Sequence, residues 1–207
     1  MKTIFIVLFC LCVATFASAA DGCQYLWDDI NIADDGKFLY EGKPVTGVMC
    51  SYDSNKILEL KGSLKNGLED GVLTAYYPNG KTRQETPYKN GVREGLTKAY
   101  YTNGQVSQET PHKNGVREGV TKYYEEDGVL SQEETHKNNL LEGTMKVYDE
   151  DGKLFIQILY KSDESVSGAC ANGRALTSKE LEGWDSGYDI YCDVESDDAP
   201  PPWKLKE

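Results

Sequence analysis

A period of 24 residues governs the middle of this 207-residue chain. Four segments align without a gap: Asn66–Lys89, Asn90–Lys113, Asn114–Lys137 and Asn138–Lys161. The second and third segments both begin with Asn-Gly-Val-Arg-Glu-Gly. A fixed period in this range is typical of repeat architectures, in which each unit buries its apolar surface against its neighbours. Residues that recur in every unit are therefore expected to be structural, and residues that break the register are better candidates for function.

Two turn signals divide each unit. In the second unit, Asn90-Gly91 begins the repeat and Asn103-Gly104 splits it. The Asn-Gly pair favours hairpin turns in which both central residues have positive φ. The intervals leave room for one strand each, over about 96–102 and 105–113, and strands joined by tight turns pair antiparallel. The pattern predicts an all-β fold, an elongated antiparallel β-meander that forms a single-layer sheet of 24-residue hairpins.

Columns of glycine and tyrosine extend the pattern upstream. Glycine recurs at 47, 71, 95, 119 and 143, which predicts a turn or bulge of the backbone at each position. These columns indicate a degenerate first repeat over 41–65, so the repeats are expected to cover 41–161. Equivalent tyrosines two strands apart would lie about 9.5 Å apart on one face. That ladder is either a binding stripe or the apolar face of a thin sheet. The candidate binding residues are Tyr52, Tyr76, Tyr100, Tyr124 and Tyr148.

Two features complicate a simple sheet. Apolar residues fall on both parities of the first strand of each unit, so the pattern does not assign one face to the core. Pro87 and Pro111 lie late in the second strand, and proline donates no hydrogen bond to a neighbouring strand. We therefore expect the second strand to be short or bulged at that end.

The first 20 residues have the features of a signal peptide. A basic start at Lys2 precedes the apolar run Ile4–Phe16, and Ala17-Ser18-Ala19 has the form of a cleavage site. Cleavage after Ala19 or the next residue would yield an exported protein, periplasmic or extracellular. A lipid-anchored form beginning at Cys23 is the less favoured alternative, because the residues before it make a poor lipidation motif.

Four cysteines remain after removal of the signal peptide: Cys23, Cys50, Cys170 and Cys192. An even number in an oxidising compartment indicates two disulfides. Because two cysteines precede the regular repeats and two follow them, we expect the first pair and the last pair to be joined. A metal site is the alternative, and it is disfavoured because the chain has no CxxC pair with a nearby histidine.

The disulfides are expected to close the ends of the repeat array. Residues 21–40 would form an N-terminal cap and residues 162–192 a disulfide-stapled C-terminal cap. Within the latter, Thr177-Ser178-Lys179-Glu180 is a capping-box pattern, which predicts a short helix through about Trp184. Residues 193–207 are acidic and proline-rich and are expected to be a disordered tail.

The formal net charge is −12 at pH 7. A charge of this sign argues against nucleic acid and against an anionic membrane surface as partner. It leaves an unidentified protein partner, with a basic one favoured electrostatically. Because apolar residues are expected on both sheet faces, pairing with a second copy of the chain remains open.

The sequence gives little support for catalysis or for a bound cofactor. The two histidines, His112 and His136, are 24 residues apart in the register of Tyr88 and Tyr160, which marks a repeat position. The chain contains no catalytic, phosphate-binding or metal motif, so we expect no enzyme, no cofactor and no metal. Acids before Gly128 and Gly152 raise calcium as an alternative, although their spacing is that of turns. A hydrolase with its site in the C-terminal cap is the remaining enzymatic hypothesis.

One repeat motif carries a family resemblance. Tyrosine, Asn-Gly, Lys-Asn-Gly and a further glycine recur in order from Tyr76 to Gly95 and from Tyr100 to Gly119. This motif resembles the bacterial variant of the MORN repeat, found in YwqK-like proteins named as toxin–antitoxin antitoxins, over residues 36–161. The resemblance implies β-hairpin arrays that scaffold protein contacts. The leading hypothesis is an exported non-enzymatic scaffold, and the alternative is an antitoxin or immunity-like protein that neutralises a toxic partner.

Overall fold

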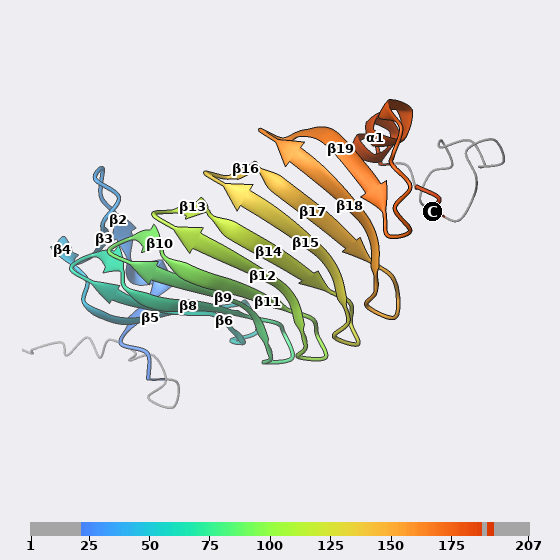
Figure 1. Cartoon of the computed structure of the whole chain (residues 1–207). Helices are drawn as coiled ribbons and strands as arrows, with labels where there is room; N and C mark the ends of the chain where they lie inside the picture. The colour runs from blue at the N-terminus through green and yellow to red at the C-terminus, as the bar shows by residue number, and fades with distance from the viewer. Residues whose placement is uncertain (1–21, 188–189, 193–207) are drawn as a thin grey trace, which may run out of the picture.

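The computed structural model describes residues 22–187 and 190–192. The expected signal peptide (1–20) and tail (193–207) lie outside the described residues. Within them, a long open sheet of 16 strands follows the order of the chain, and a small three-stranded sheet stands at its N-terminal end (Figure 1). All pairings between successive long strands are antiparallel, so the predicted meander of hairpin repeats is confirmed.

Each unit contains two long strands. The first is β5 (Gly47–Tyr52), β8 (Gly71–Tyr76), β11 (Gly95–Tyr100), β14 (Gly119–Tyr124) and β17 (Gly143–Tyr148). The second is β6 (Leu58–Lys65), β9 (Thr82–Lys89), β12 (Val106–Lys113), β15 (Leu130–Lys137) and β18 (Leu154–Lys161).

A third, two-residue strand precedes each first long strand, which the sequence did not predict. These short strands are β4 (Lys43–Pro44), β7 (Leu68–Glu69), β10 (Val92–Arg93), β13 (Val116–Arg117) and β16 (Leu140–Leu141). From β7 on, each pairs with the long strand before it. The remaining elements are β1 (Tyr25–Leu26), the 3-10 helix η1 (Trp27–Asp29), β2 (Asn31–Ile32), β3 (Phe38–Tyr40), β19 (Glu164–Cys170) and α1 (Ser178–Asp185).

The two turns of a unit have different conformations. At the first, Asn90 and Gly91 both have positive φ (50° and 79°), as predicted for this class of hairpin. At the second, only Gly104 has positive φ, and its N–H donates to the carbonyl of Tyr101 at 2.9 Å. The Asn103 side chain accepts from the N–H of Gln105 at 2.8 Å. The prediction of two positive φ values was therefore wrong for the second turn, which is a three-residue loop.

The glycine column marks the break between the short strand and the first long strand. Gly95, with φ 114°, is the first residue of β11 and directly follows the break after β10. A Cβ there would lie 3.2 Å from Cγ of Pro87, tighter than ordinary van der Waals contact. Both the backbone conformation and the close approach to the neighbouring strand require glycine.

The prolines do not shorten the second strand, contrary to expectation. β9 contains Pro87 and is eight residues long, as is β15, which has Thr135 at the same register. The carbonyl of Pro87 accepts from the N–H of Glu94 at 3.1 Å. Because the N–H and C=O of one strand residue point to the same side, the proline nitrogen also faces β10 and β11 rather than β8. On that side, β9 pairs with β11 through only two residues of each strand, and Pro87 is not one of them. The proline therefore removes no hydrogen bond between strands.

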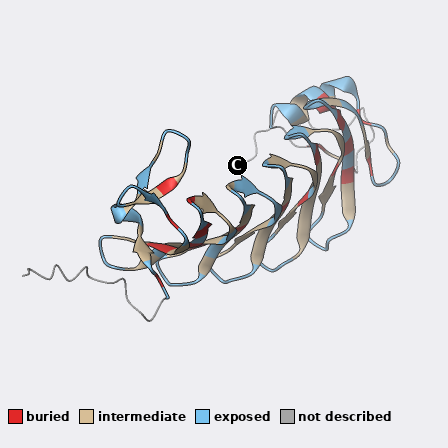
Figure 2. Ribbon diagram, turned by 90° about the vertical axis from the view of Figure 1, so that its left-hand side faces the viewer, coloured by how far each residue is buried: buried red, intermediate tan, exposed pale blue. Residues whose placement is uncertain are grey.

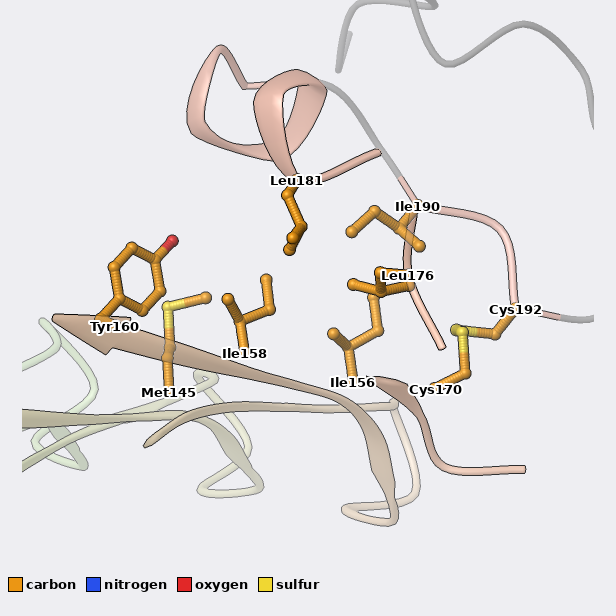
Figure 3. Close-up of a cluster of buried hydrophobic side chains, with 9 residues drawn as sticks. All are labelled: Met145, Ile156, Ile158, Tyr160, Cys170, Leu176, Leu181, Ile190 and Cys192. Carbon is orange, nitrogen blue, oxygen red and sulfur yellow. A yellow bond between two sulfur atoms is a disulfide. The ribbon is translucent and has the colours of Figure 1, made fainter. Parts of the chain in front are cut away.

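Both caps pack on the same face of the long sheet, called the inner face below (Figure 2). At the N-terminal end, Phe38 and Val45 bury Met49 and Leu64 of the first unit. At the C-terminal end, Leu181 of α1 and Ile190 point onto Ile156 and Ile158 of β18 (Figure 3).

The apolar cores therefore lie at the two ends. The middle units bury polar side chains instead, namely Thr86, Thr110, Thr121 and His136.

Disulfides hold the segments that cover the two sheet edges. Cys23 is joined to Cys50 and Cys170 to Cys192, the two pairs expected from the sequence. Next to Cys23, β1 pairs in parallel with β5. At the other edge, Ala175 bridges to Ala169 of β19. An uncovered edge would present unpaired N–H and C=O groups to another chain, so these caps protect the sheet from edge pairing.

The C-terminal helix begins as the sequence predicted. Thr177 is the N-cap of α1, its hydroxyl accepts from the N–H of Glu180, and the Glu180 carboxylate accepts from the N–H of Thr177. Arg174 forms an ion pair with Glu180 at 2.9 Å. Trp184 packs against the same core as Leu181, which places the helix on the last repeat.

Candidate binding face

The outer face of the sheet, opposite the caps, carries three parallel rows of side chains. In β11 they are represented by Leu96, Lys98 and Tyr100, which alternate with the inner-face residues Thr97 and Ala99. A register shift at the Ala99–Tyr100 position recurs in all five units. It is a β-bulge in the second strand of the same unit, opposite the tyrosine.

The hydroxyl groups of the tyrosine row form hydrogen bonds to the preceding unit. Tyr100 donates to Glu85 of the preceding unit at 2.7 Å, and the contact recurs from Tyr124 to Glu109 at 3.2 Å and from Tyr148 to Glu133 at 2.9 Å. Burial, with the Glu85 carboxylate as the second cause, raises the pKa of Tyr100 to about 12. These tyrosines therefore join consecutive units as well as lining the face.

Charged residues of alternating sign form the middle row. Lys98 pairs with Glu109 at 3.3 Å, and Lys146 pairs with Glu133 at 3.4 Å. Because these pairs are only partly shielded from solvent, each contributes at most about 1 kcal/mol to stability. Their main effect is to hold the long side chains flat along the sheet.

The third row is apolar and exposed. Val72, Leu96 and Val120 follow the glycines of three successive units, and Leu159 continues the row on β18. Their exposed fractions are 49%, 41%, 41% and 44%. Pro87 pairs with Val72 and Pro111 with Leu96, so prolines fill the spaces between them. The row forms an apolar strip along the outer face, interrupted between Val120 and Leu159 by Thr135 and Thr144. Exposed apolar strips of this kind are typical of interaction surfaces.

A hollow of about 300 Å³ lies at the C-terminal end of this strip. Its lining includes Thr144, Gln157, Leu159 and Ser167. Thr144 and Leu159 are directly paired between β17 and β18, and Ser167 lies opposite Leu159 on β19. The hollow thus forms a recess at one end of the strip.

The five candidate tyrosines occupy the same position, the last residue of the first long strand in every unit. Tyr52 differs in its surroundings, because its hydroxyl lies 3.4 Å from Sγ of Cys23. A binding role for this row remains a prediction. The neighbouring apolar strip was missed by sequence reasoning, although an apolar residue directly after each of three periodic glycines was a readable signal.

The inner face also contains a polar cluster that the sequence did not reveal. Glu134 accepts from the Tyr123 hydroxyl at 2.9 Å and from Nε2 of Gln132 at 2.7 Å, and it lies 3.6 Å from Nε2 of His136. His136 is 3% exposed. Burial, with Arg117 as the second cause, lowers its pKa. In most other units, the positions equivalent to Tyr123 and Glu134 hold small or apolar residues. This difference was the sequence signal that could have revealed the polar cluster.

The described part of the chain contains no group of three or more His, Cys, Asp or Glu side chains arranged to hold a metal ion. The acids before Gly128 and Gly152 serve the turns, where Asp127 and Asp149 each accept a backbone N–H two residues on. Among the described helices, none has the length and apolar character needed to span a membrane.

Two comparisons with known proteins found similar sequences. The chain is 46% identical over 48 residues to the protein named Ataxin-2 homolog of Drosophila pseudoobscura pseudoobscura, a match that covers 23% of this chain and 4% of that protein. The family model of the MORN repeat variant matches four times, at residues 69–90, 93–114, 117–138 and 141–162. MORN repeats are generally associated with scaffolds that bind proteins or membranes. Residues 69–162 thus match four tandem copies of the MORN repeat variant, and this region of the chain is a MORN-repeat array.

Proposed function

We propose that this protein is an exported, non-enzymatic repeat scaffold that binds a protein partner at the cell envelope or outside the cell. The observation that carries the proposal is the exposed apolar strip of Val72, Leu96, Val120 and Leu159. Burying apolar surface in a complex contributes roughly 25 cal/mol per Å² before the costs of association. A strip that runs over consecutive units suits an extended partner surface better than a small molecule.

Export is supported by two observations. The two disulfides are typical of proteins that mature in an oxidising compartment. The N-terminal sequence has the order of a signal peptide. Mass spectrometry of the protein from its native source tests this step: a mature chain that begins near Asp21 supports export, and a chain that retains Met1 or Lys2 contradicts it.

The binding surface is tested by crosslinking and pull-down from periplasm or culture medium. The double variant Leu96→Glu, Val120→Glu places charge on the strip, and Ile32→Glu is the matched control, because Ile32 is 61% exposed on β2 of the small sheet. We expect the native protein and the control to recover the same partner and the double variant to lose it. Recovery of no partner above background, or an unchanged recovery with the double variant, contradicts the proposal.

The same variants distinguish a second copy from a different protein. If the partner is another copy of this chain, light scattering after size-exclusion chromatography will give a dimer mass for the native protein and a monomer mass for the double variant. A monomer mass in both cases leaves a different protein as the occupant of the strip.

A second candidate function is that of an antitoxin or immunity-like protein of the bacterial YwqK-like type, which neutralises a basic toxic partner. The supporting observation is an acidic hollow of about 600 Å³ between the second turns of the third and fourth units. Its lining includes Glu125, Glu126, Asp127 and Glu150, which would attract a basic surface. Deleting the gene alone, and then with its neighbours, tests this function: absence of any neighbour-dependent toxicity rejects it.

A further inference from the structure

Two arginines occupy the same register in consecutive middle units. Arg93 pairs with Tyr88 between β10 and β9, and Arg117 pairs with His112 between β13 and β12. Directly paired residues project from the same face of a sheet, so both arginines belong to the inner face. Equivalent positions in adjacent units lie about 9.5 Å apart. The preceding unit has Glu69 at this register and the following unit has Leu141, so the arginine pair is specific to the middle of the array.

Neither arginine has a carboxylate partner among the described residues. Nε of Arg93 donates to the hydroxyl of Tyr88 at 3.2 Å, and Nη2 of Arg117 donates to the carbonyl of Asn139 at 2.8 Å. Both arginines therefore lie outside any ion pair of the described residues, although Arg117 lies near the Glu134 cluster, since its charge acts on Tyr123 and His136. The outer face differs, because its Lys98 is paired with Glu109. Two guanidinium groups without an ion-pair partner in the described part of the chain, on one face of a protein with net charge −12, form a local positive site.

His112 lies between the two arginines. Its Nδ1 lies 3.1 Å from the carbonyl of Thr110 and 3.2 Å from the hydroxyl of Thr97. Its Nε2 forms no hydrogen bond within the described residues. The pKa of His112 is lowered by burial first and then by the charges of Arg93 and Arg117. The imidazole is half-buried and Arg93 is exposed, so solutes can reach the group.

We propose that Arg93, His112 and Arg117 form a binding site for an oxyanion, a carboxylate or phosphate group, on the inner face of the middle units. Guanidinium groups present forked donors that match the oxygens of either anion. Once the anion has neutralised the arginine charges, protonation of His112 adds a further charged donor beside it. The site is separate from the outer apolar strip and does not depend on the proposed scaffold function.

Proton NMR tests this site, because the chain has only two histidines. Inorganic phosphate and glutarate are titrated separately into the full-length mature protein, with sodium chloride added to hold the ionic strength constant. The imidazole resonances of His112 report the site directly, and those of His136, whose pKa is also lowered by Arg117, report the Arg117 side of it. The double variant Arg93→Gln, Arg117→Gln removes the site, and Arg83→Gln is the control, since Arg83 is an exposed arginine at the bulge of β9.

We expect a saturable shift of the His112 resonances and a rise in its pKa in the native protein and in Arg83→Gln. In the double variant, affinity falls about tenfold or more, because two charge-assisted contacts are lost. The single variant Arg93→Gln, which changes an exposed side chain, gives an intermediate loss and serves if the double variant does not fold. A response to phosphate alone assigns a phosphoryl ligand, and a response to glutarate alone assigns an acidic side chain.

The proposal is overturned by either of two results. One is a response of His112 in the native protein that equals the chloride control for both anions. The other is a response of the same affinity in the native protein and in the folded arginine variants.

Discussion

The carboxylate of Glu94 accepts a hydrogen bond from the backbone N–H of Asn114 at 2.8 Å. Asn114 begins the turn of the next unit, so this contact fastens each turn to the unit before it. The relationship recurs throughout the array, between Thr46 and Asn66, Asp70 and Asn90, Glu118 and Asn138, and Glu142 and Ser162. Part of the negative charge of the chain is therefore structural, and only the acids outside this register are available to a partner.

Removing the carboxylate at this junction is expected to destabilise the array. Glu94→Ala leaves the N–H of Asn114 without its charged acceptor, and we expect a loss of about 1 kcal/mol in the free energy of unfolding. Glu126→Ala is the control, because it removes the same charge from a turn where the Glu126 side chain lines the acidic hollow. Urea unfolding followed by circular dichroism measures both. Equal losses in the two variants would show that net charge, rather than the junction, determines the effect.

The glycine of the second turn is required for its conformation. Gly80 has φ 79°, and a Cβ there would meet nothing within 4 Å. Gly80→Ala is therefore expected to lower the free energy of unfolding by roughly 1 kcal/mol through backbone strain alone. Gly80→Asn should lose less, because asparagine adopts positive φ more readily. If thermal unfolding shows equal losses for both substitutions, backbone strain is not the cause.

The two histidines are expected to make stability depend on pH. Burial lowers the pKa of both His112 and His136 in the folded protein. As the pH falls below about 6.5, the unfolded chain therefore binds protons before the folded protein does. The free energy of unfolding should fall from about pH 7.5 to about pH 5. In the double variant His112→Gln, His136→Gln this decrease should be smaller, and an unchanged decrease would assign it to other groups.

The tyrosines of the outer face are expected to ionise at a higher pH than an ordinary tyrosine. The pKa of Tyr100 is about 12, raised by burial and by its hydrogen bond to Glu85. Because the folded pKa exceeds the ordinary value of about 10, Tyr100 favours the folded state below pH 10, and this contribution is lost as the pH rises further. Glu85→Gln should move part of the tyrosinate absorbance to lower pH, whereas the exposed Glu59→Gln should not. Coincident titration curves for both variants would contradict the assignment.

The C-terminal disulfide is expected to stabilise its cap by restricting the unfolded chain. The cysteines are 22 residues apart, which corresponds to about 3 kcal/mol in the chain-entropy model. With Trp27 and Trp203 replaced by Phe so that Trp184 alone emits, urea unfolding of Cys170→Ser, Cys192→Ser followed by fluorescence should shift to lower denaturant. The far-UV signal of the repeats should shift less, because the cap contacts only the last unit directly. Identical shifts in both signals would show that cap and repeats unfold together.

Several features of this fold followed from the sequence because they depend on residues close together in the chain. The Asn90-Gly91 turn, the break at Gly95 and the capping box at Thr177 each require particular residue types at adjacent positions. The period of 24 then repeats these local choices, and the order of the four cysteines relative to the repeats favoured the observed pairing.

Other features depend on contacts between units, which local sequence does not encode. The tolerance of Pro87 within a full-length strand and the pairing of the short strand β10 follow from how adjacent units meet. The bulge opposite Tyr100 arises between the two strands of one unit. Apolar side chains lie on both faces, so the pattern alone did not show which face receives the caps and which remains exposed.

The 24-residue period by itself determined a meander of hairpins with its recurrent turns and its tyrosine column. Only the tertiary structure decided that both caps cover the inner face, that Leu96 and its equivalents remain exposed, and that Arg93, His112 and Arg117 lie together. The physical reason is that periodicity specifies which residues are equivalent, whereas the packing of the ends on one face determines which equivalent residues remain accessible to a partner.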